Sequence, residues 1–356
     1  YGTVTGVQTC ALPISTSITI PDSVTSIFKF AFKNCPALII TNINNPNYSS
    51  DDQGILYNKD KTTLIHCPNS LTSVVIPDSV TSIGDSAFRG CSSLTSIILG
   101  NNVTSIDSSA FSGCYSLEEL TLPNLFDHAL SYYFNSSVPS SLKKVTINSG
   151  DIPRDAFYNC SSLTSIILRN NVTSIDSSAF SGCNSLEELT LPSLFDHALS
   201  YYFDSSVPSS LKKVIINSGN IPSEAFFGCS SLASITIPDS VTSIGSQTFC
   251  DCSSLTSITI PDSVTSIGHN AFWSCSSLTS ITIPDSVTSI GDYAFSHCSS
   301  LTSVFYKGTA EQWNTISISN GNSDLTSATL YYYSETQPTD TTYKYWHYVD
   351  GVPTAW

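Results

Sequence analysis

The chain has 356 residues, a formal net charge of −15 at pH 7 and only 12% charged residues. This acidic balance disfavours nucleic acid and anionic membrane surfaces as partners, because both are negatively charged. No apolar run reaches the roughly 18 residues that a membrane-spanning helix needs, so we expect no membrane insertion of this fragment.

One short unit recurs along most of the chain, as the near-identical stretches from Leu255 and from Leu278 show, and a fixed period of this kind is typical of stacked repeats. These two copies differ from each other at only four positions. Two irregular copies, entered at Ser15 and Leu38, precede the regular ones. We therefore predict an α/β repeat solenoid, a strand-rich leucine-rich-repeat stack of about 13 turns with short helical segments. The other copies begin at Leu71, Leu94, Leu117, Leu142, Leu163, Leu186, Leu211, Leu232 and Leu301.

The first part of each unit predicts a short strand. In one regular copy, Leu255, Ile258 and Ile260 are spaced as the buried face of a strand is, ending in strict alternation. Pro261 and Asp262 then end the strand, since proline has no amide hydrogen to donate and Asp favours turns.

The second part of the unit predicts one short helical turn, because Ala271, Phe272 and Cys275 lie at positions i, i+1 and i+4. In-register stacking then places the phenylalanine of each unit in one buried column. This column is expected to contain Phe32, Phe88, Phe111, Phe157, Phe180, Phe226, Phe249, Phe272 and Phe295.

The recurring motif L-T-S-I-T-I-P-D-S-V-T-S-I-G-x-x-A-F-x-x-C resembles the BspA-like class of leucine-rich repeats, from Ser15 to about Thr302. Such repeats occur in surface proteins of anaerobic bacteria and of some parasitic protists, and the better-known members are adhesins. The resemblance implies a non-enzymatic, extracellular or cell-surface protein that binds a host matrix or cell-surface protein or a glycan. A structural spacer within a larger surface protein, with no ligand of its own, is the alternative.

Residues 1–14 do not belong to the repeat. The run Val4–Ile14 resembles the translation of a sequencing-adapter oligonucleotide, and the repeat resumes in mid-unit immediately after it. We therefore expect 1–14 to be a non-native start of a truncated gene product, which has lost its signal peptide with the true N-terminus. The solenoid is expected over residues 15–333.

The copy from Leu38 to residue 70 is longer than the unit and predicts a β-hairpin, with strands on either side of a polar turn at Asn58–Lys61. Asp51 and Asp52 raise the alternative of a calcium loop. Because the regular alternation of calcium ligands is missing, we favour a solvated turn.

Twelve cysteines are present, and ten of them recur at or next to one position of the unit. We expect these ten to be buried free thiols, because neighbours at the strand spacing are too far apart for a disulfide. Cys250 is an additional thiol, for which an exposed position stays open. The ten are Cys35, Cys67, Cys91, Cys114, Cys160, Cys183, Cys229, Cys252, Cys275 and Cys298.

Between Leu94 and Gly228 the unit varies with a second period that is three units long, as the even spacing of Cys91, Cys160 and Cys229 shows. Two copies of LFDHALSYYF, at Leu125–Phe134 and Leu194–Phe203, are expected to bulge from the stack as amphipathic helices of two to three turns. Their tyrosines are candidate ligand contacts, although burial against the stack is the alternative that we favour: Tyr132, Tyr133, Tyr201 and Tyr202.

Asp127-His128 and its copy Asp196-His197 are the best catalytic or metal candidates in the sequence. Adjacent residues on a helix do not face each other, so we interpret them as surface polar residues. Phosphate-binding, zinc-protease and serine-hydrolase motifs are all missing. We expect no catalytic residue, cofactor or metal site.

The same region carries paired charges that predict cross-strand ion pairs, with Glu118 beside Lys143 and Glu119 beside Lys144. The next copy repeats the pattern with Glu187, Glu188, Lys212 and Lys213. All eight residues belong to the candidate ligand-binding surface.

The regular turns present hydroxyl groups at the outward positions of their strands, and these complete the candidate surface: Thr256, Ser257, Thr259, Thr279, Ser280 and Thr282. Asp239, Asp262 and Asp285 form an acidic column at the strand ends. Such a column raises calcium as an alternative, but we favour local turns in which Asp accepts backbone hydrogen bonds.

After Leu301 the unit dissolves, and residues 301–333 predict a cap that closes the last open edge. Residues 334–356 form a Thr- and aromatic-rich tail. The sequence leaves open whether this tail is a docked strand or a loose terminus.

Overall fold

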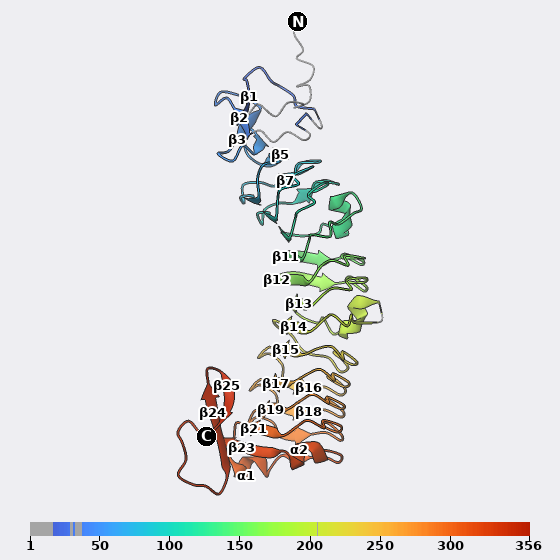
Figure 1. Cartoon of the computed structure of the whole chain (residues 1–356), viewed down its shortest axis with the longest axis vertical. Helices are drawn as coiled ribbons and strands as arrows, with labels where there is room; N and C mark the ends of the chain where they lie inside the picture. The colour runs from blue at the N-terminus through green and yellow to red at the C-terminus, as the bar shows by residue number, and fades with distance from the viewer. Residues whose placement is uncertain (1–16, 29–30, 33–37, 205) are drawn as a thin grey trace. The chain divides into compact units, whose positions relative to one another are not determined.

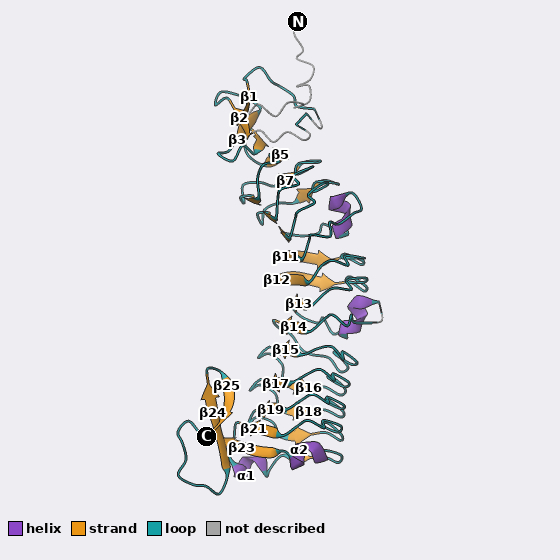
Figure 2. Ribbon diagram, viewed as in Figure 1, coloured by secondary structure: helices purple, strands orange, loops and turns teal. Residues whose placement is uncertain are grey.

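The computed structural model describes residues 17–28, 31–32, 38–204 and 206–356. The adapter-like run 4–14, Ser15 and Cys35 lie outside these residues. The chain is a β-solenoid of about 13 turns, strand-rich with little helix, as the repeat period predicts (Figures 1 and 2). It divides into two compact units, residues 1–184 and 185–356.

In the first unit, strands of successive turns pair in parallel and in register, for example Val74 with Ile97. The main ladder has the order β12-β11-β10-β8-β6. Its strands are β6 (Ser73–Val75), β8 (Ser96–Ile98), β10 (Glu119–Leu122), β11 (Lys144–Ile152) and β12 (Ser165–Ile175). A second ladder joins β5 (Thr63–His66), β7 (Ser82–Ile83) and β9 (Ser105–Ile106), and β1 (Ser17–Ile20) pairs with β2 (Leu38–Thr41).

The predicted hairpin in the long early copy is confirmed. The strands β3 (Tyr48–Ser50), β4 (Leu56–Asn58) and β5 pair antiparallel. The Asp51 carboxylate accepts hydrogen bonds from the backbone N–H groups of Gln53 and Ile55 and from the Tyr57 hydroxyl. This carboxylate is therefore engaged in holding the turn, as expected for a turn aspartate.

In the second unit strands of successive turns again pair in parallel, and they form three ladders. One runs β13 (Glu188–Leu191), β14 (Lys213–Ile216) and β15 (Ser234–Thr236). Another has the order β17 (Ser257–Thr259), β19 (Ser280–Ile283), β21 (Ser303–Tyr306), β23 (Thr329–Tyr333), β24 (Lys344–Val349) and β25 (Val352–Ala355). The short strands β16 (Ser243–Ile244), β18 (Ser266–Ile267), β20 (Ser289–Ile290) and β22 (Ser317–Ile318) form the third ladder.

The phenylalanine column forms as predicted. The ring centroids of Phe226, Phe249, Phe272 and Phe295 follow one another at 5.3, 5.1 and 5.0 Å, and all four rings are fully buried. Identical flat rings stack at this distance because each turn repeats the backbone of the one before it. The other predicted members are buried as well.

The column also contains a phenylalanine that the prediction omitted. Phe134 is buried, and its ring centroid lies 5.6 Å from that of Phe111. The N–H of Phe111 donates to the carbonyl of Tyr133, the residue before Phe134. In the same way, the N–H groups of other column phenylalanines donate to the alanine that precedes the phenylalanine of the next turn. Phe203, its copy, is buried too. Each lies one full unit after a column phenylalanine, Phe111 or Phe180, so the unvarying Phe period was the available signal.

The predicted helical turn at Ala271–Cys275 is wrong. The segment consists of hydrogen-bonded turns, because Asn270 immediately before it and Ser274 within it have φ angles of 54° and 61°. A left-handed residue every four positions interrupts any right-handed helix. The i, i+4 spacing of Ala271 and Cys275 instead arises from two successive turns, which place the side chains of Phe272 and Cys275 in the same buried core.

The ten described cysteines are buried and unbridged, including Cys250, which is only 3% exposed. A column thiol donates to the carbonyl oxygen of the phenylalanine one turn earlier. The distance is 3.1 Å from Cys275 Sγ to Phe249 O and 3.1 Å from Cys298 Sγ to Phe272 O. The thiols thus satisfy carbonyl groups at a corner of the stack.

The last repeat turn continues both ladders through β22 and β23, with two short helices in place of the usual loops. These are α1 (Ala310–Trp313) and α2 (Ser323–Ser327). Thr309 caps α1 through a reciprocal pair of hydrogen bonds with Gln312. Beyond β23 the tail docks, with β24 parallel to β23 and β25 antiparallel to β24.

Candidate binding surface

The two bulges are not the amphipathic helices that their apolar spacing predicts. In each, only the last five residues are helical, as the 3₁₀ turns η1 (Leu130–Phe134) and η2 (Leu199–Phe203). Phe126 and Asp127 have φ angles of 48° and 60°, which excludes a right-handed helix there. The backbone is also committed to neighbouring turns, since the N–H of Leu130 donates to the carbonyl of Ala156.

Adjacent tyrosines in each bulge lie in opposite environments. Tyr133 is fully buried and its hydroxyl donates to the carbonyl oxygen of Leu125 at 2.5 Å, whereas Tyr132 is 38% exposed. In the second copy Tyr202 is buried and Tyr201 is 40% exposed. Tyr133 and Tyr202 are therefore not part of the candidate ligand-binding surface, because their rings are buried in the core and their hydroxyls donate hydrogen bonds to backbone carbonyls there.

The exposed tyrosine of each bulge carries a stacked histidine. The rings of His128 and Tyr132 lie 3.9 Å apart at 16°, and those of His197 and Tyr201 lie 4.0 Å apart at 13°. Tyr133 contacts the Tyr132 ring edge-on at 5.3 Å and so supports the first pair from below. Each bulge thus presents a pre-ordered pair of flat rings to solvent.

The sequence predicts His128 and His197 only as surface polar residues. Their i, i+4 spacing to Tyr132 and Tyr201 was the signal that would have paired them, although the pairing arises here through a turn rather than a helix. Asp127 and Asp196 are exposed beside the ring pairs. Flat rings next to a carboxylate can contact both apolar faces and hydrogen-bond donors of a ligand.

The charged residues lie in the predicted register. Glu119 pairs with Lys144 and Glu188 with Lys213, with 3.5 Å between the charged atoms in both cases. Outside the strands, Glu118 and Glu187 accept through their backbone carbonyls from Lys143 and Lys212. The Lys143 ammonium turns to the carbonyls of Ser140 and Ser162 instead of Glu118.

Reversing one charge in this register is expected to have a small effect, because the pair is exposed. Glu119→Lys should lower the free energy of unfolding by about 0.2–1 kcal/mol, and adding Lys144→Glu should recover most of that loss. Urea denaturation at low and high salt, arranged as a double-mutant cycle, measures it. Glu118→Lys is the control, and an equal loss there would show that general charge rather than the pair is responsible.

The hydroxyl face is exposed at Thr256, Ser257, Thr259 and Thr279, and Ser280 is half-buried. The prediction that Thr282 belongs to the exposed surface is wrong, since this residue is only 3% exposed. Thr282 lies at an outward strand position, as predicted, but it pairs in register with the bulky Phe305. Trp346 of the tail packs against the Phe305 ring, so this part of the outer face is covered.

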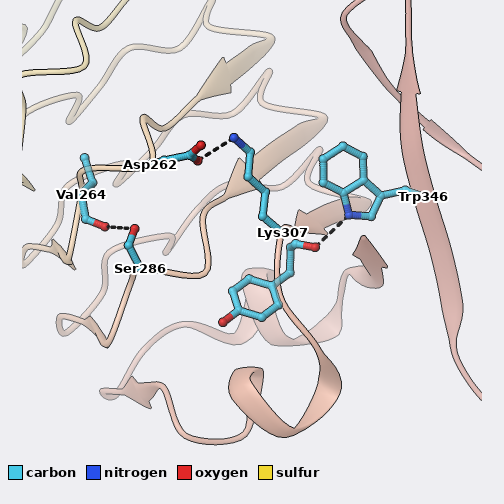
Figure 3. Close-up of polar contacts among 6 residues, drawn as sticks. Asp262, Val264, Ser286, Lys307 and Trp346 are labelled. Carbon is cyan, nitrogen blue, oxygen red and sulfur yellow. Dashed lines mark hydrogen bonds and ion pairs between the residues drawn. The ribbon is translucent and has the colours of Figure 1, made fainter. Parts of the chain in front are cut away.

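Among the described residues, no three His, Cys, Asp or Glu side chains gather closely enough to hold a metal ion. The acidic column carries an internal cation instead, because Lys307 Nζ lies 2.6 Å from Asp262 Oδ1 (Figure 3). A small cavity of about 60 Å³ beside η2, lined by Leu199, Pro208 and Leu232 among others, has room for little more than water. No helix in the described part of the chain combines the length and apolar character needed to cross a bilayer.

The model of the BspA type leucine rich repeat region, with six copies of the repeat, matches residues 11–74, 66–151, 150–236 and 219–337. The chain is a BspA-type leucine-rich repeat protein. Members of leucine-rich repeat families typically bind proteins and are generally not enzymes. The residues that match this repeat form the parallel strand ladders and the buried Phe and Cys columns of the solenoid.

Several solved leucine-rich repeat proteins are similar to this chain. A protein from Bacteroides ovatus is 28% identical, with 89% of this chain and 83% of that chain covered and a TM-score of 0.39. A leucine rich cell surface protein from Faecalibacterium prausnitzii is 26% identical, with 85% and 90% covered and a TM-score of 0.30.

A leucine-rich repeat protein from Eubacterium ventriosum is 25% identical over 72% of this chain, with a TM-score of 0.29. The repeat protein described here spans 58% of that protein's length. No curated protein sequence matches the chain.

Proposed function

We propose that this leucine-rich repeat protein acts at the cell surface, outside the cell, and binds a host matrix or cell-surface protein or a glycan. The observation that carries the proposal is the exposed ring pair of each bulge, His128 with Tyr132 and His197 with Tyr201. Exposed tyrosines held in one geometry lose little entropy on binding, which is why they are common at contact sites. The surface location is an expectation from the family.

A structural spacer is the second candidate, and the regular turns favour it. The hydroxyl of Thr279 donates to the carbonyl of Thr256, and that of Thr302 donates to the carbonyl of Thr279. These donors are therefore used between turns rather than held free for a ligand. On this basis we assign contact to the bulges and spacing to the uniform turns.

Binding to arrays of extracellular-matrix proteins and of glycans tests the proposal. The variant Tyr132→Ala/Tyr201→Ala should lose at least tenfold in affinity for whichever array member the unaltered chain binds, since removing a contact aromatic commonly weakens binding by about 2 kcal/mol or more. Thr256→Glu/Thr279→Glu is the matched control on the strand face and should bind normally. Loss in the control alone would assign contact to the strand face, and failure of the unaltered chain on both arrays would favour the spacer.

A further inference from the structure

The long copy that carries the β3–β5 hairpin contains no phenylalanine, so the column lacks a phenyl ring at this turn. The backbone shows that Cys67 stands in its place. The N–H of Cys67 donates to the carbonyl of Ala87 at 2.9 Å. The N–H of Phe88 makes the same bond to Ala110, also at 2.9 Å. The carbonyl of Cys67 accepts from Cys91 Sγ at 3.3 Å, as phenylalanine carbonyls do in later turns. Cys67 therefore occupies the phenylalanine position and not the cysteine position of the unit.

An imidazole lies next to this small side chain in the core. His66 is only 8% exposed, and its ring centroid lies 5.2 Å from that of Phe32. Of the six histidines of the chain, all of which lie in the described residues, His66 alone is buried. Its Nε2 atom is buried without a hydrogen-bond partner. A titratable ring with one unsatisfied nitrogen thus stands where the other turns bury a phenyl ring.

His66 also ends the strand that joins the hairpin copy to the regular turns. The strands β1 and β2 form a sheet of their own, and the main ladder begins at β6. The join between β5 and β7 consists of two residue pairs, Thr63 with Ser82 and Leu64 with Ile83. Each turn of a repeat stack is supported mainly by its neighbours, so a short junction of this kind can open while the remaining turns stay folded.

Protonation of His66 opposes the closed state of this junction. Burial lowers the pKa of the His66 imidazole from an ordinary 6.5 to about 4. A charged imidazolium in an apolar site is costly, and the cost is relieved when the turn opens to water. Because the pKa is lower in the closed state, the contribution of neutral His66 is complete above pH 6.5 and is lost as the pH falls from 6.5 towards 4.

The groups around the imidazole do not supply a competing titration in that range. Burial raises the pKa of the Tyr57 hydroxyl, and a hydrogen bond with Cys91 together with burial raises that of the Cys67 thiol, so both stay neutral in acid. The two carboxylates already accept hydrogen bonds from neighbouring hydroxyl groups. Among the described residues, the titratable groups on the elements next to His66 are Tyr57 on β4, Asp51 before it, Asp85 after β7, and the thiols of Cys67 and Cys91.

We propose that His66 is an acid-sensitive switch, whose protonation opens the junction between the hairpin copy and the regular turns while the stack from β6 onward stays folded. The opening uncovers Cys67, which is fully buried in the closed state. The device depends on this one turn, because the other turns bury phenyl rings that carry no titratable group.

The thiol of Cys67 reports the opening. The full chain is labelled between pH 7.5 and 4.5 with a dipyridyl disulfide, which reacts with thiols in acid, and the labelled sites are located by peptide mapping. Rates are divided by that of a short cysteine peptide at the same pH. The normalised rate at Cys67 should rise at least about tenfold between pH 6.5 and 4.5, because opening takes up one proton. The rate at Cys275, fully buried in the regular turns, should stay constant.

His66→Phe should abolish the rise at Cys67, because a phenyl ring does not titrate, and His66→Leu is the second variant and should do the same. The slope against pH is the result, so a variant that loosens the turn at every pH still answers the question. Asp51→Asn is the matched control on the hairpin and should keep the rise. An equal rise in His66→Phe, its loss in Asp51→Asn alone, a flat profile in the unaltered chain, or a parallel rise at Cys275 would overturn the inference.

Discussion

Phe249→Ala is expected to lower the free energy of unfolding by about 3–5 kcal/mol. The ring is fully buried between Phe226 at 5.3 Å and Phe272 at 5.1 Å, so truncation leaves a cavity inside a column that neighbouring turns cannot close. Because each turn is supported mainly by its neighbours, the loss should be felt most in the adjacent turns. Urea denaturation followed by circular dichroism measures the total, and hydrogen exchange locates it.

Phe227→Ala is the matched control. Phe227 is the same residue type in the preceding unit but is 49% exposed, so its removal should change stability by about 0.5 kcal/mol or less. A loss below about 1 kcal/mol for Phe249→Ala, or equal losses for the two variants, would mean that the column does not carry the core.

Mildly alkaline solution is expected to destabilise the fold through the thiol column. Burial raises the pKa of the Cys160, Cys229 and Cys298 thiols from an ordinary 9.0 to about 12. In the unfolded chain these thiols ionise near pH 9, while in the folded chain they keep their protons. Their contribution is therefore complete below pH 9 and is lost as the pH rises from 9 towards 12. Each thiol should remove about 1.4 kcal/mol of stability per pH unit in that range.

Other column thiols act in the same direction, since burial also raises the pKa of Cys114, Cys183, Cys252 and Cys275. The loss of stability should therefore be steeper than a single thiol would cause. Denaturation midpoints between pH 8 and 10, in reductant and without oxygen, measure it. Cys275→Ala should reduce the slope of the free energy of unfolding against pH by the contribution of one thiol. A free energy of unfolding that stays level from pH 8 to 10 would rule the mechanism out.

Much of the fold was predictable because every turn repeats the same short-range pattern. Leu255, Ile258 and Ile260 identify the buried face of a strand, and the copy of that strand in the next unit has only one in-register way to pair. The same argument predicts the Glu119–Lys144 and Glu188–Lys213 contacts, and both are present in the structure. It failed at Ala271–Cys275, where left-handed residues make turns that share the apolar spacing of a helix.

The candidate surface was predicted less well. Outward strand positions follow from the period, yet Thr282 is covered by the tail, and Tyr132 and Tyr133 are neighbours in sequence with opposite exposure. The His128–Tyr132 pair depends on the positive φ angles of Phe126 and Asp127, which residue type alone does not indicate.

From the sequence by itself came the number of turns, the register between them and most residues of the Phe and Cys columns. These follow from periodicity, because identical units make identical contacts with their neighbours. The tertiary structure alone decided which tyrosine of each bulge is exposed and where residues 334–356 lie. The exposed tyrosine depends on the left-handed turn at Phe126 and Asp127, which residue type does not reveal. The place of the tail depends on single, non-repeating contacts such as Trp346 with Tyr306 and Lys307 with Asp262, which join residues 40 and 45 positions apart and leave no period in the sequence.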